Sequence, residues 1–185
     1  TPAALEQTFD MLQATANDIA DWQGAPTLFT RYRGDGWQMA LSDPKLALRA
    51  CLQIMAAVQS LGQGHATRIA VGEGEGRFSP PDLADASGEA FVTSGQMLDK
   101  IEQNIRLFHA KGGEKSAVFR LSGYLAENWT QAQARSMALS LAPNRPTHSE
   151  TAKLLKISRQ AVEKSLAGAG FNAIDDALTS YEAAT

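Results

Sequence analysis

Asp35 stands between two glycines in the stretch FTRYRGDGWQMAL, residues 29–41, where a carboxylate could either shape a turn or bind a metal ion. Aromatic and polar residues alternate on both sides of it, over residues 27–33 and 37–41, which is typical of β-strands. An Asp-Gly pair between two such runs predicts a tight hairpin, because glycine accepts the positive φ of a primed turn. The turn alone is sufficient to explain Asp35, and metal binding is the alternative.

A second group of polar residues lies in PTHSETAKLLKISRQAVEKSL, residues 146–166. Thr147 and Glu150, three residues apart, predict a capping box that starts a short helix. A tight turn follows at residues 156–158, and Ser158 suits the N-cap of a second helix. Val162 and Leu166 would face the core from that helix.

This segment resembles a DNA-binding helix-turn-helix, although that family usually has glycine where Lys156 stands. In such motifs the N-terminal residues of the second helix point towards base edges in the major groove. The resemblance implies base contacts by Arg159 and Gln160, both suited to bidentate hydrogen bonds, with Lys164 pointing outward nearby. The residues expected to meet phosphates are Arg145, Lys153 and Lys156. The alternative is a helix pair that packs against protein only.

The stretch RYRGDGWQMALSDPKLALRACLQIMAAV, residues 31–58, resembles the central hairpin and following helix of class III nucleotide cyclases. Residues 67–76 and 88–98 resemble the next segments of that domain, in the same order. The resemblance implies that Asp35 matches the second of two metal-binding aspartates and Arg31 the base-recognising lysine. In that family the first aspartate lies on a strand that precedes the opening helix. This chain begins with that helix.

The transition-state Asn and Arg of that family fall on Val92 and Gln96. Removing one donor of this kind commonly costs about 3 kcal/mol, so we expect a catalytically degenerate domain. It would need no cofactor beyond residual Mg²⁺ or Mn²⁺ at Asp35, and a nucleotide could remain its ligand. An active nucleotidyl cyclase is the alternative.

The composition and the order of the predicted elements indicate the class of protein. The chain has 185 residues, 44% of them hydrophobic, with a net charge of −3. It has no apolar run of membrane-spanning length, and its single cysteine, Cys51, lies among apolar residues at helical spacing. We therefore expect a cytoplasmic protein without membrane contact, and we interpret the three histidines, at positions 65, 109 and 148, as surface residues.

Helices are predicted over residues 1–21, 45–61 and 88–104, and strands over 27–33, 37–41, 67–74 and 116–125. Four helices should follow, the last of them capped by Asn172. The expected class is α+β, with a ferredoxin-like, cyclase-like mixed sheet over residues 1–122 and an all-α helix-turn-helix domain over 123–185. This order resembles the SatD family of bacterial proteins. We expect a homodimeric DNA-binding transcription regulator, and a protein-interaction module is a further alternative.

Overall fold

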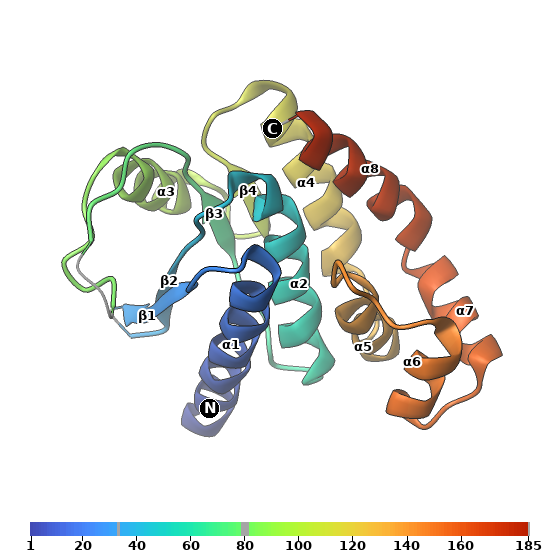
Figure 1. Ribbon diagram of the computed structural model, residues 1–185. Coiled ribbons are helices and arrows are strands. Elements are labelled where there is room, and N and C mark those ends of the chain that lie inside the picture. The colour runs from blue at the N-terminus through green and yellow to red at the C-terminus, as the bar shows by residue number, and fades with distance from the viewer. Residues whose placement is uncertain (33, 79–81, 185) are drawn as a thin grey trace.

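The computed structural model describes residues 1–32, 34–78 and 82–184, and they form a mixed α+β structure dominated by helices (Figure 1). The helices are α1 (Pro2–Gln23), α2 (Ala47–Ser60), α3 (Glu89–Lys100), α4 (Gly113–Glu127), α5 (Gln131–Ser140), α6 (His148–Leu155), α7 (Arg159–Gly168) and α8 (Phe171–Ala184), with a 3₁₀ turn η1 (Pro44–Leu46) before α2. The strands are β1 (Leu28–Tyr32), β2 (Gly36–Ala40), β3 (Ile69–Val71) and β4 (Leu107–His109). None of the described helices combines the length and apolarity that crossing a bilayer requires.

The predicted hairpin around Asp35 is confirmed, but its turn differs from the prediction. β1 and β2 pair antiparallel, with Tyr32 opposite Gly36 at the turn end. Gly34 and Asp35 lie in the turn between the strands, and Gly34 has the positive φ of +74°. Gly36 is the first residue of β2, so Asp35 does not belong to a two-residue Asp-Gly turn.

The second sheet contains β3 and β4, which pair in parallel with Val71 opposite His109. Helix α3 lies between them in the chain, as a parallel crossover requires. The described strands thus form two separate two-stranded sheets rather than the single mixed sheet expected from the sequence. The sequence pattern also did not predict β4, because it contains only three residues.

The strand predicted over residues 116–125 is wrong, because this segment lies within α4. Phe119, Ser122, Gly123 and Ala126 are buried at helical spacing and face the rest of the molecule. A Cβ atom at Gly123 would lie 2.6 Å from Cβ of Leu107, so glycine permits α4 to approach β4 closely. Packing against β4 therefore determines the structure of a segment whose local pattern is ambiguous.

The hydrophobic core is centred on α2, which packs between α1 and α5 (Figure 1). Polar contacts join α2 to α5 and α8: Arg49 on α2 donates to the Leu141 carbonyl and to Glu182, and Gln53 donates to the Ala138 carbonyl. The core includes residues from both sides of residue 122, the expected domain boundary, and that boundary falls inside α4. Burial raises the pKa of the Cys51 thiol to about 12, which agrees with the apolar residues around it in the sequence.

Candidate nucleic-acid interface

Helix α6 begins at the capping box predicted for Thr147 and Glu150. The Thr147 hydroxyl accepts a hydrogen bond from the Glu150 N–H at 3.3 Å, and the Glu150 carboxylate accepts from the Thr147 N–H at 2.8 Å. Hydrogen bonds from the Thr147 side chain and backbone also hold the pKa of Glu150 below its usual value. Two of the free donors at the helix start are satisfied in this way, so the short helix has a defined beginning.

A turn of three residues, 156–158, joins α6 to α7. Lys156 has φ +56° and is the only non-glycine residue with a positive φ in the part of the chain that the structure describes. The Ile157 N–H then donates to the Ala152 carbonyl at 3.0 Å, which closes the end of α6. The Ser158 side chain accepts from the Ala161 N–H at 3.1 Å and caps α7, as predicted.

Helix α5 supports this pair from behind, since it packs against both α6 and α7. Ala152 on α6 and Val162 and Leu166 on α7 are buried, as the sequence pattern predicts. The Trp129 indole N–H donates to the Ala169 carbonyl at 2.9 Å and fixes the end of α7. The three helices consequently present one side of α7 to solvent.

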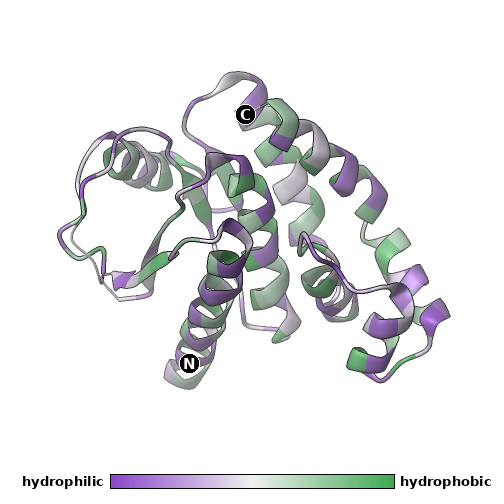
Figure 2. Cartoon of the chain, viewed as in Figure 1, coloured by the Kyte–Doolittle hydropathy of each residue, from purple (hydrophilic) through white to green (hydrophobic). Residues whose placement is uncertain are grey.

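The solvent side of α6 and α7 carries five of the six residues predicted to contact DNA. Gln160, Lys164, Lys153 and Lys156 are exposed, and Figure 2 shows hydrophilic residues on the outer faces of these helices. Arg159 is exposed as well, but its Nε donates to Glu163 at 2.8 Å. Hydrogen bonding by Arg159 keeps the pKa of Glu163 below its usual value, so this pair is ionised at neutral pH.

The net charge of this segment is opposite in sign to that of the whole chain. Residues 147–168 contain four lysines and arginines against two glutamates, which gives +2, while the chain carries −3. The positive charge is therefore local, and it lies on the face that α5 leaves free.

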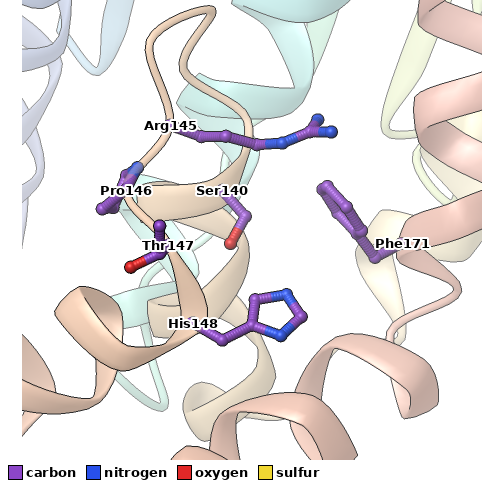
Figure 3. Close-up of a pocket in the computed structure, with 6 residues that line it drawn as sticks. All are labelled: Ser140, Arg145, Pro146, Thr147, His148 and Phe171. Carbon is purple, nitrogen blue, oxygen red and sulfur yellow. The ribbon is translucent and has the colours of Figure 1, made fainter.

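Arg145, the sixth of these residues, faces α8 instead. Its Nη1 and Nη2 lie 2.6 and 3.1 Å from the Asp175 carboxylate, and its guanidinium lies over the Phe171 ring, 5.1 Å from the centroid. Figure 3 shows Arg145, Phe171 and His148 around an open cavity of about 240 Å³ between the helices. The structure thus joins Arg145 to α8, and a phosphate contact would have to replace Asp175.

The residues matched to cyclase positions lie on the hairpin and on α3. Arg31 donates to the Glu6 carboxylate at 2.9 and 3.0 Å and lies over the Phe9 ring, so it joins β1 to α1. Asp35 is exposed in the hairpin turn, and Val92 and Gln96 are exposed on α3. The described residues also contain no group of three His, Cys, Asp or Glu side chains placed to hold a metal ion.

A polar cluster that the sequence did not predict lies at the ends of β3 and β4. His109 is fully buried, so its interpretation as a surface residue is wrong. The Lys111 backbone N–H donates to Nδ1 of His109 at 3.1 Å, which leaves Nε2 of His109 to donate to Glu73 at 3.1 Å. Lys115 also donates to Glu73, at 2.7 and 3.0 Å, and the Tyr181 hydroxyl of α8 lies 3.4 Å from the same carboxylate.

Burial and charge act in opposite directions within this cluster. Burial lowers the pKa of His109 and outweighs the attraction of Glu73, so the imidazole is neutral. Burial alone would raise the pKa of Glu73, but the hydrogen bond from Lys115 and the nearby His109 lower it below its usual value. The result is an ionised carboxylate that holds β3, β4, α4 and α8 together. No sequence signal identified it, because its histidine lies on the strand that was not predicted.

Comparison of the chain with protein-family models, with curated proteins and with solved structures found no match.

Proposed function

We propose that the protein is a cytoplasmic, DNA-binding transcription regulator in which α6 and α7 form a helix-turn-helix and α7 is the recognition helix. The observation that carries this proposal is the pair of capped helices joined by a three-residue turn. Helix α5 packs against both of them, and residues 147–168 carry a net charge of +2. In helix-turn-helix proteins the second helix of such a pair enters the major groove.

Arg159 and Gln160 are the proposed base-reading residues, because they lie in the first turn of α7 and are exposed. Arg159 would exchange Glu163 for a base edge on binding. An exposed pair of this kind contributes little to stability, so its loss is a small penalty beside a bidentate base contact. Lys153, Lys156 and Lys164 would neutralise phosphates, which positions the protein without reading sequence.

The rest of the chain would be a catalytically degenerate, cyclase-like platform for dimerisation or ligand sensing. The exposed Val92 and Gln96 support this, since neither supplies the charge that the cyclase transition state needs. Arg31 supports it too, because its guanidinium already contacts Glu6 and Phe9. A nucleotide would remain a candidate ligand rather than a substrate, with Mg²⁺ or Mn²⁺ at Asp35 as its only metal.

The test is selection of bound sequences from random DNA with the full chain, followed by affinity measurements on the selected site against salt concentration. Arg159→Ala and Gln160→Ala should each relax the sequence preference, by about 1–3 kcal/mol of discrimination. Lys153→Ala should weaken binding to every sequence and flatten the salt dependence, because a lost phosphate contact no longer releases counterions.

The matched control is Lys100→Ala, which removes the same charge from an exposed position on α3. It should change neither affinity nor salt slope. Equal effects of Lys100→Ala and Lys153→Ala, or no enriched sequence, would overturn the proposal.

A further inference from the structure

Helix α4 has one face that packs on the molecule and an opposite face that carries apolar residues into solvent. Leu121, Tyr124 and Leu125 are 67%, 58% and 41% exposed. Large exposed apolar patches on soluble proteins mark interaction sites, and these three side chains lie on the same exposed helix.

The exposed face follows the spacing of a coiled-coil seam. Glu114, Ala117, Leu121, Tyr124 and Asn128 are separated by three, four, three and four residues, and all of them are exposed. These intervals correspond to successive a and d positions of a heptad. The buried residues of α4 occupy other heptad positions, so the seam is not needed for the fold of the single chain.

From this pattern we infer that α4 is a dimerisation helix whose seam pairs antiparallel with the same seam of a second copy of this chain. The symmetry follows from the seam itself, because an isologous contact uses the same patch on both subunits. An antiparallel order places the partner's Ala117 against Asn128 and brings Leu121 beside the partner's Tyr124. A parallel order would instead bring two Glu114 carboxylates together.

Charges beside the seam favour the same order. Arg120 and Glu127 flank the seam on one side of α4, seven residues apart. Both side chains are partly exposed in the single chain. In the antiparallel pair each Arg120 guanidinium approaches the partner's Glu127 carboxylate, which gives two symmetric ion pairs across the seam.

The C-terminal end of the seam lies beside the end of α7. A groove of about 280 Å³ borders the C-terminal end of the seam, between Tyr124, Leu125 and the end of α7 at residues 167–170. The antiparallel order therefore places the two α7 helices at opposite ends of a helix pair that is about 22 Å long for 15 residues. Two half-sites on DNA require such a separated pair, but the dimer itself does not depend on the proposed DNA binding.

A four-turn helix pair lies at the low end of specific interfaces, below about 1,200 Å², so we expect a concentration-dependent dimer. The experiment is sedimentation velocity of the full chain over a range of concentrations, without DNA. Leu121→Glu should raise the dimer dissociation constant about tenfold or more, because it buries a carboxylate opposite the partner's seam. Val92→Glu, an equally drastic change at a site that is 52% exposed on α3, should leave the constant unchanged.

Charge exchange separates this contact from a loss of folding. Arg120→Glu and Glu127→Arg should each weaken the dimer, and the double variant should restore it, since the ion pairs then form in the opposite sense. A monomer at every concentration would overturn the inference. So would a dimer that Val92→Glu dissociates and Leu121→Glu leaves intact, because that dimer uses another face of the molecule.

Discussion

At the scale of single residues, His109 shows how burial determines what a side chain can do. Its imidazole is neutral in the folded protein because burial lowers its pKa below the ordinary value of about 6.5. The unfolded chain therefore binds a proton at a higher pH than the folded chain does. The free energy of unfolding should fall as the pH drops below about 6.5 and continue to fall towards the lower pKa of the folded state. The lowered pKa of Glu73 adds a further loss in the same direction, starting near 4.5 and extending below it.

The corresponding prediction is that His109→Asn flattens the pH dependence of stability between pH 5.5 and 7, because its side chain does not titrate. Denaturant unfolding at several pH values measures this slope directly. If His109→Asn kept the wild-type slope, titration of His109 would not contribute to stability in this range.

At the scale of elements, two helical glycines should respond to alanine in opposite directions. Gly123 lies where α4 meets β4, and a Cβ there would come within 2.6 Å of Leu107, so Gly123→Ala forces the two elements apart. Such overpacking typically costs about 1–3 kcal/mol. Gly95 lies in α3 with no atom within 4 Å of an added Cβ, so Gly95→Ala should stabilise the protein by about 0.5–1 kcal/mol through helix propensity. Thermal unfolding of both variants should show shifts of opposite sign, and a gain in stability for Gly123→Ala would contradict the close packing of α4 on β4.

Elements with local determinants could be predicted from the sequence, and those fixed by tertiary contacts could not. The capping residues Thr147 and Ser158 act within one turn of the chain, so the first residues of α6 and α7 were correctly predicted. By contrast, β4 is recognisable only through its pairing with β3, and α4 reads as a strand until its contact with β4 is known. The cluster around His109 was missed for the same reason. Arg159, Gln160 and three lysines were placed on the solvent side correctly, whereas the pairing of Arg145 with Asp175 joins residues 30 positions apart and leaves no local pattern.

At the scale of the whole molecule, the proposed dimer and the proposed DNA interface make a joint prediction about salt. Each copy offers three exposed lysines on α6 and α7, at positions 153, 156 and 164, for contact with phosphates. With a slope of about −0.9 per phosphate, one copy should show a dependence of log affinity on log salt near −2.7, and a dimer about twice that. Leu121→Glu should therefore halve the slope on a site with two half-sites, and it should bind a single half-site as the wild type does. Val92→Glu should retain the full slope.

Filter binding or fluorescence anisotropy between 50 and 200 mM salt measures both slopes. If Leu121→Glu is monomeric without DNA and still shows the full slope, the DNA assembles the two copies without the α4 seam. If no variant binds DNA, the proposed DNA interface is overturned, and sedimentation alone then tests the dimer.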